Sequence, residues 1–215
     1  MRNKDWTLVF FTVLSQLSVG VIVCVSWLVG FENDSRFLNL LGPQFKNPVL
    51  LALVSVGVAT VISLLHLGNP KNAPRSLNNL AGSWVSREIL ALATYSVSLL
   101  IIFFLGWKNL GFESLRYLLM MSSVFGGLLL WMMSRIYMIP TIPPWNSWYT
   151  WLSFISTAAC LGMMTILLLH YSVFVREGCM ACYSRFIDDP TSRMLVGALC
   201  LVLLVEIFGA FVHQS

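Results

Sequence analysis

The chain has 215 residues, of which 58% are apolar and only 10% are charged. An ordinary soluble domain has about 25% charged residues, so this composition excludes a soluble enzyme, and the high apolar content excludes an intrinsically disordered chain. Thirteen Lys and Arg residues against nine Asp and Glu residues give a formal net charge of +4, which gives no reason to expect nucleic acid as a partner. The composition therefore predicts a polytopic helical membrane protein.

Six segments are apolar enough to cross a bilayer, since a transmembrane helix needs about 20 mostly apolar residues. In chain order they are Trp6–Phe31, Asn47–Pro70, Ile89–Trp107, Tyr117–Ser134, Trp148–Val173 and Met194–Val212, the last interrupted only by Glu206. Backbone exposed to lipid must satisfy its own hydrogen bonds, so each segment is expected to be a helix. We therefore predict an all-α bundle of six transmembrane helices that forms one integral membrane domain over residues 1–215.

An even number of spans places both termini on the same side of the membrane, which we call side N. Side N carries six Lys and Arg residues, namely Arg2, Lys4, Lys71, Arg75, Arg87 and Arg135. The other side carries seven, namely Arg36, Lys46, Lys108, Arg116, Arg176, Arg185 and Arg193. The positive-inside rule barely separates the two orientations and favours, by one residue, an N-terminus outside the cell.

The five cysteines divide into three inside predicted spans and one CxxC pair between spans five and six. Cys24, Cys160 and Cys200 are expected to behave as small apolar groups. Cys179 and Cys182 have no second ligand pair nearby to complete a zinc site, and two thiolates are too few for an iron–sulfur cluster. We interpret the pair as plain loop thiols, with a redox or metal role as the alternative.

The three histidines bear on whether the bundle holds a b-type haem, which is usually ligated by paired histidines from facing helices. His66 ends the second span on side N, whereas His170 ends the fifth span on the opposite side. Only His66 and His213 share a side. A haem-binding anchor is therefore the less favoured alternative, and no metal site is predicted.

The densest group of polar residues is the segment HLGNPKNAPRSLNNLAGSWVSREI at residues 66–89, between the second and third spans. Gly68 is expected to help end the second helix just after His66, and Ser83 or Ser86 to cap the third helix. The 21 residues between His66 and Glu88 are expected to form a loop. This places His66 and Glu88 at the same membrane interface.

Two further ionisable residues lie within spans near side N. Arg135 ends the fourth span, and Glu206 lies seven residues, roughly 10 Å, before His213. Such residues can simply anchor helices among the headgroups, but an ionisable group inside the membrane is a functional candidate by default. An acid, an imidazole and a cation at one interface suit a ligand with an apolar tail and a polar ring, such as a quinol.

Three motifs carry a resemblance to a known family. The segment at residues 66–89 resembles the signature of the DmsC family, the membrane anchor subunits of dimethyl sulfoxide reductase-type complexes. The opening WTLVFFTVLSQLSVG resembles that family's first helix, and RIYMIPTIPPWNSW resembles its fourth connection. The family usually has eight helices, where six are predicted here.

The resemblance implies a quinol-oxidising anchor in the bacterial cytoplasmic (inner) membrane. Such an anchor passes electrons from menaquinol to an iron–sulfur partner subunit and on to a molybdopterin catalytic subunit, and it holds no haem or cluster of its own. The family's quinol-pocket histidine and glutamate fall on His66 and Glu88. By position, Trp84 and Arg135 are added as candidate quinol-binding residues, and Glu206 as a candidate for a proton route.

Three alternatives remain open at this stage. The protein can be a purely structural anchor without quinol chemistry, a haem b anchor, or a small transporter in which Glu206 carries protons. Arg75 and Arg87 are expected to anchor the interface, or to contact lipid phosphate or a partner subunit.

Overall fold

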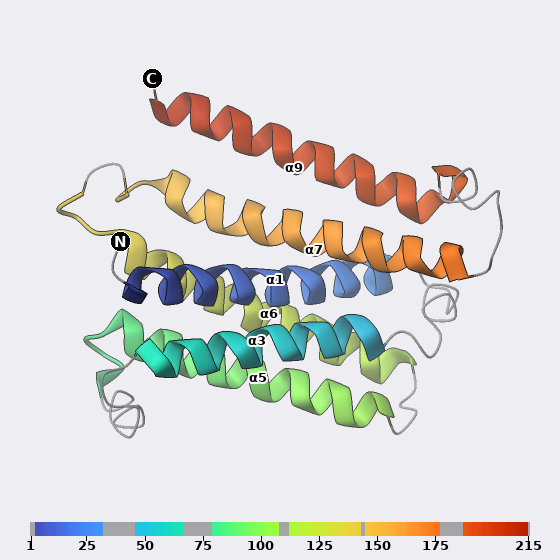
Figure 1. Cartoon of the computed structure of the whole chain (residues 1–215), viewed down its shortest axis with the longest axis horizontal. Coiled ribbons are helices and arrows are strands. Elements are labelled where there is room, and N and C mark those ends of the chain that lie inside the picture. Colours follow the sequence, from blue (N-terminus) through green and yellow to red (C-terminus); the bar gives the residue numbers. More distant parts are fainter. Residues whose placement is uncertain are drawn as a thin grey trace.

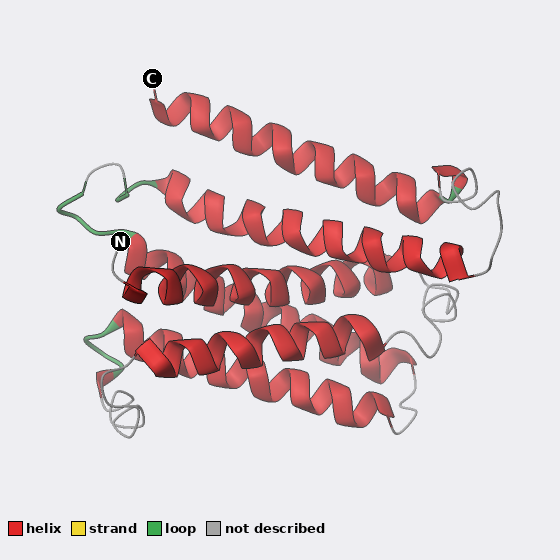
Figure 2. Ribbon diagram, viewed as in Figure 1, coloured by secondary structure: helices red, strands yellow, loops and turns green. Residues whose placement is uncertain are grey.

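The computed structural model describes residues 3–31, 46–66, 79–107, 112–142, 145–176 and 187–214. These residues form six α-helices and no strand (Figure 2). The helices are α1 (Asn3–Phe31), α3 (Lys46–His66), α5 (Trp84–Trp107), α6 (Phe112–Tyr137), α7 (Trp148–Arg176) and α9 (Pro190–Gln214). Each helix coincides with all or most of one of the six predicted segments, so the predicted all-α bundle is confirmed.

The number of full-length spans differs slightly from the prediction. Within the described residues, five helices are long and apolar enough to cross a membrane, and α3 contributes a shorter apolar segment, Pro48–Leu64. At 1.5 Å per residue, those 17 residues cover roughly 26 Å, a little less than the hydrocarbon core of about 30 Å. The protein is therefore a multi-pass membrane protein.

Several helices begin earlier than the uncharged runs predicted, and for α5 and α9 the contacts at the start explain why. The α5 helix begins at Trp84 because the backbone N–H of Ser86 donates to the Ser83 hydroxyl oxygen, with 3.3 Å between the two atoms. The expected 21-residue loop was therefore too long, since it ends at Ser83. The α9 helix begins at Pro190, where Asp189 accepts the N–H of Ser192 at 2.9 Å. Charged residues are tolerated in the first turn of a helix at the interface, so counting uncharged residues misplaces such helix starts.

The helices run side by side, with α1 at the centre of the bundle (Figure 1). Helix α1 packs against α3, α6 and α7, while α5 packs against α6 and α3. Helix α9 packs chiefly on α7 and forms the outer layer (Figure 1). The start of α1, the ends of α3, α6 and α9, and the starts of α5 and α7 all lie at one end of the bundle, on the left of Figure 1. That end is side N.

Helices α1 and α7 approach each other closely where they cross at Gly20 and Gly162. A Cβ added at Gly20 would lie 1.8 Å from the backbone oxygen of Ala158, and one at Gly162 would lie 2.2 Å from the backbone oxygen of Gly20. Small residues at such positions allow backbones to pack directly against each other in membranes. The pair Ala158 and Gly162, four residues apart, forms that small surface on α7.

Buried hydroxyl groups join the central helices. The Ser18 hydroxyl donates to the Ala52 carbonyl at 2.7 Å and lies 3.0 Å from the Tyr95 hydroxyl, which connects α1, α3 and α5. The hydroxyls of Ser98 and Ser122, 2.8 Å apart, connect α5 with α6. These contacts set the rotation of α5, and hence which of its side chains face the bundle at side N.

Candidate functional site

The first turn of α5 is held tightly to the residues that precede it. Arg87 donates from Nε to the Leu80 carbonyl at 2.8 Å and from Nη2 to the Ala81 carbonyl at 2.7 Å. Its guanidinium carbon also lies 4.3 Å from the centre of the Trp84 ring. The sequence predicted an interface residue at Arg87 but not this clamp, which fixes Trp84 at the membrane surface.

Trp84 also contacts Arg135 at the end of α6. The Arg135 guanidinium carbon lies 4.9 Å from the centre of the Trp84 ring, within the range of a cation–π interaction. Two of the predicted site residues, from different helices, are thus brought together at side N. Among the described residues, the buried Nε of Arg135 has no hydrogen-bond partner. A buried donor of this kind costs about 1–3 kcal/mol when it stays unpaired, so an incoming oxygen atom would be favoured there.

Glu88 points away from Arg87 because consecutive helical residues are about 100° apart. Leu92, Tyr95 and Leu99 continue the same face of α5, and all three are buried in the bundle. Glu88 therefore faces the interior rather than open lipid. The Tyr137 hydroxyl of α6 lies near Glu88 and near the Thr12 hydroxyl of α1. Side chains from α1, α5 and α6 thus meet around Glu88.

Tyr137 and Thr12 belong to this group, although the sequence pattern did not single them out. Thr12 begins a buried polar stripe on α1 that continues through Ser15 and Gln16. Polar residues at positions i, i+3 and i+4 of an otherwise apolar span share one helix face, so this spacing was the signal available. The stripe shows that α1 turns a polar face into the interior of the bundle near side N.

His66 is the last residue of α3, and its side chain lies outside the described residues. The backbone nevertheless places it at side N, on a helix that packs against both α1 and α5. Arg75, Cys179 and Cys182 also lie outside the described residues. Within the part of the chain that the structure describes, no three His, Cys, Asp or Glu side chains form a group able to hold a metal ion.

Glu206 lies in a separate group between α7 and α9. The Tyr149 hydroxyl donates to Glu206 Oε1 at 3.2 Å, and the Ser156 hydroxyl hydrogen-bonds to Glu206 Oε2. His213 stacks on the Tyr149 ring, with 5.1 Å between ring centres. Tyr137 lines a cavity of about 270 Å³ together with Tyr149 and His213. Among the described residues, the hydrogen-bond partners of Glu206 are Tyr149 and Ser156, and not Trp84 or Arg135.

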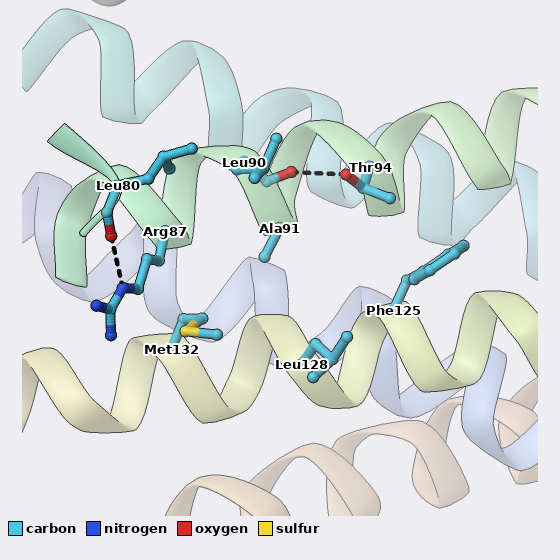
Figure 3. Close-up of a pocket in the computed structure, with 8 residues that line it drawn as sticks. All are labelled: Leu80, Arg87, Leu90, Ala91, Thr94, Phe125, Leu128 and Met132. Carbon is cyan, nitrogen blue, oxygen red and sulfur yellow. Dashed lines mark hydrogen bonds between the residues drawn. The ribbon is translucent and has the colours of Figure 1, made fainter. Parts of the chain in front are cut away.

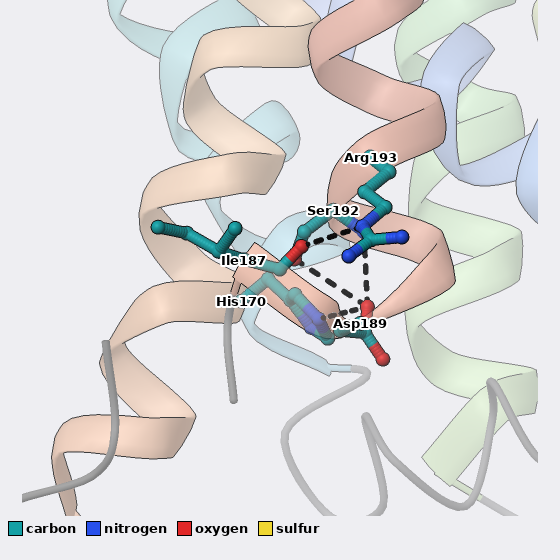
Figure 4. A network of polar contacts seen from close by, with 5 residues as sticks. All are labelled: His170, Ile187, Asp189, Ser192 and Arg193. Atoms are coloured by element: carbon teal, nitrogen blue, oxygen red, sulfur yellow. Dashed lines mark hydrogen bonds and ion pairs between the residues drawn. The ribbon is translucent and has the colours of Figure 1, made fainter. Parts of the chain in front are cut away.

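His170 is engaged on the side opposite side N. Its Nε2 lies 3.1 Å from Asp189 Oδ2, the oxygen that also caps α9 (Figure 4). Arg193 bonds to Asp188 Oδ1 at 2.8 Å in the same corner. These contacts join the end of α7 to the start of α9, which agrees with the prediction that His170 and His66 lie on opposite sides.

Comparison with known proteins identifies the family. A sequence profile of the DMSO reductase anchor subunit (DmsC) family matches residues 1–189. The protein belongs to this family. It is 31% identical over 173 residues to the anaerobic dimethyl sulfoxide reductase protein YnfH of Escherichia coli (strain K12), an alignment that includes 74% of this sequence and 55% of that protein. The resemblance inferred from the three motifs is confirmed.

Two other anaerobic dimethyl sulfoxide reductase proteins give the same result. The sequence is 32% identical over 162 residues to one from Haemophilus influenzae, and the alignment includes 74% of this sequence and 56% of that protein. It is 31% identical over 166 residues to a second one from Escherichia coli, and that alignment includes 71% of this sequence and 53% of that protein. The protein thus spans about half the length of the curated relatives it matches. No solved structure matches it.

Proposed function

We propose that this anchor-family protein oxidises menaquinol at side N and passes the electrons to an iron–sulfur partner subunit. The observation that supports this most is the meeting of α1, α5 and α6 around Glu88, Tyr137 and Thr12, beside the Trp84–Arg135 contact. The group combines a proton acceptor (Glu88), a buried hydrogen-bond donor without a partner among the described residues (Nε of Arg135) and an aromatic ring (Trp84) at the level of the headgroups. A lipid-soluble quinol can reach that level sideways from the bilayer.

In the proposed reaction each quinol releases two protons and two electrons and becomes a quinone. Glu88, directly or through water, accepts a proton from a ring hydroxyl as electrons leave. His66 hydrogen-bonds the other ring oxygen and relays its proton to the aqueous phase, since an imidazole titrates near neutral pH. The buried Nε–H of Arg135 donates to a ring oxygen, and the Trp84 ring stacks against the quinol ring.

The electrons leave through a cluster of the iron–sulfur partner docked over side N, and continue to a molybdopterin catalytic subunit. Side N is then both the partner face and the outer face of the cytoplasmic (inner) membrane, with the N-terminus outside. In this scheme this protein supplies the electrons, and the partner reduces the terminal substrate.

The deciding experiment compares Glu88→Gln with Glu113→Gln in the assembled complex. Both substitutions remove one carboxylate, but Glu113 is exposed in the first turn of α6, at the end of the bundle away from side N. Loss of a positioned general base costs roughly 10²-fold or more in rate. We expect quinol-analogue oxidation to fall by about that factor in Glu88→Gln and to stay unchanged in Glu113→Gln.

A soluble electron donor that reduces the partner subunits directly serves as the assembly control. It should give equal terminal reductase activity in both variants. Normal quinol oxidation by an assembled Glu88→Gln complex would contradict the proposed role of Glu88 as proton acceptor, whereas an assembled complex without any quinol-dependent activity would indicate a purely structural anchor. Arg135→Leu should raise the KM for quinol by about tenfold, because the lost bond to a charged donor is worth roughly 1.5–3 kcal/mol.

A further inference from the structure

A groove on the outer surface of the α5–α6 pair combines one cation with an apolar trough. Its volume is about 370 Å³, and Figure 3 shows the residues that line it. The residues that line it are Leu80, Arg87, Leu90, Ala91, Thr94, Phe125, Leu128 and Met132. Arg87 is the one charged residue among them, and the Thr94 hydroxyl already donates to the Leu90 carbonyl at 2.9 Å. The groove therefore offers a guanidinium at one end and hydrocarbon along its length.

The Arg87 guanidinium is held in place before any ligand arrives. Its Nε and one Nη2 hydrogen are used by the carbonyls of Leu80 and Ala81, and its face lies on Trp84. A guanidinium has five N–H donors, so these contacts leave three for an anion at the mouth of the groove. A planar donor group of this kind recognises phosphate oxygens in a bidentate manner.

The groove lies at a defined depth in the membrane. Tryptophans gather where the headgroups meet the hydrocarbon, and Trp6, Trp145 and Trp148 are exposed at side N together with the partly exposed Trp84. Arg87 is within one helical turn of Trp84. From Arg87 the groove follows α5 to Thr94, seven residues or about 10 Å into the apolar region.

We propose that this groove binds one anionic phospholipid, with the phosphate on Arg87 and an acyl tail along Leu90, Ala91 and Leu128. The three remaining N–H donors of Arg87 offer a phosphodiester charge-assisted hydrogen bonds, and the apolar residues along the groove suit an acyl tail. Glu88, the proposed quinol base, lies about 100° around α5 and faces the bundle interior. The lipid groove and the quinol site therefore occupy different faces of the same helix.

The test titrates phosphatidylglycerol, and phosphatidylcholine with the same acyl tails, into the delipidated full-length protein within its complex. Native mass spectrometry counts the bound lipid. Arg87→Gln should weaken phosphatidylglycerol binding about tenfold, equivalent to about 1.4 kcal/mol, with a smaller loss for phosphatidylcholine, whose choline ammonium offsets the charge of its phosphate. Arg87→Lys should restore part of the loss. Arg116→Gln is the matched control, because Arg116 bonds the Gly30 carbonyl at the opposite end of the bundle.

A second pair of measurements separates a lipid from other anions. Leu128→Trp fills the groove without touching the charge, and Leu128 is exposed enough to accept the larger ring. It should also weaken phosphatidylglycerol binding, whereas glycerophosphate, which has no acyl tails, should not compete. Unchanged binding in Arg87→Gln, equal losses in Arg116→Gln, competition by glycerophosphate, or displacement of the lipid by a quinone analogue would each overturn the proposal.

Discussion

The crossing of α1 and α7 makes a quantitative prediction about stability. A Cβ at Gly162 would lie 2.2 Å from the backbone of Gly20, and a Cβ at Gly20 would lie 1.8 Å from the Ala158 oxygen. An ordinary contact begins at 3.4 Å, so the helices would have to separate by about 1.6 Å at Gly20. Overpacking costs typically 1–3 kcal/mol. Because backbone opposes backbone here and neither side can change rotamer, we expect Gly20→Ala and Gly162→Ala each to cost about 3 kcal/mol.

The assay is reversible unfolding by SDS in mixed micelles, followed by the circular dichroism of the helices. Gly57→Ala and Gly127→Ala are matched controls, because nothing lies within 4 Å of a Cβ added at either position. Alanine forms helices better than glycine by about 0.5–1 kcal/mol, so these two variants should be unchanged or slightly more stable. If Gly162→Ala unfolds at the same SDS fraction as Gly127→Ala, the close crossing does not hold the bundle together.

Three smaller predictions concern helix ends and the second carboxylate. Ser83→Ala should lower the free energy of unfolding by about 1 kcal/mol through loss of the α5 cap, with faster amide exchange in the first turn of α5. Asp189→Ala removes the α9 cap and the His170 contact, and it should lower the free energy of unfolding by about 1–2 kcal/mol. Asp188→Ala should lower it by under about 0.5 kcal/mol, because the Asp188–Arg193 pair is exposed. Unfolding by SDS measures both changes. Glu206→Gln should leave quinol-analogue oxidation at the wild-type rate, and a fall like that of Glu88→Gln would restore Glu206 to the proton route.

The helices were predictable because a span must be long and uncharged, and both properties are read directly from the sequence. Their ends were less predictable. Trp84 and Pro190 start their helices inside segments that carry charge, which the uncharged runs alone do not place. Ser83, one of the two caps predicted for the third helix, does cap α5, whereas the cap at Asp189 was not predicted. The shift matters for the site, because the earlier start of α5 places Trp84 on the same rigid helix as Glu88.

The meeting of side chains at side N was only partly predictable. Counting spans assigns Trp84 and Arg135 to one interface, but it does not give the rotation of each helix. In a soluble bundle the polar face reveals that rotation, whereas in lipid the outer face is as apolar as the inner one. Tyr137 and Thr12 therefore join the Glu88 group only once buried hydrogen bonds such as Ser18 to Ala52 orient the helices.

Glu88 and Glu206, two carboxylates on helices near side N, differ in what surrounds them, and this difference argues for one proton acceptor. A charged group inside a membrane is costly, by roughly 2.5–3.5 kcal/mol on insertion scales. Glu206 offsets that cost with the Tyr149 and Ser156 hydroxyls, on a helix whose other side is largely exposed apolar surface. Its neighbour Gly209 lets α7 approach closely, since an added Cβ would lie 2.9 Å from Leu152. The hydrogen bonds of Glu206 thus give it a structural role, because they hold α9 to α7. Glu88 faces the centre of the bundle, and no comparable structural role explains a carboxylate at that position.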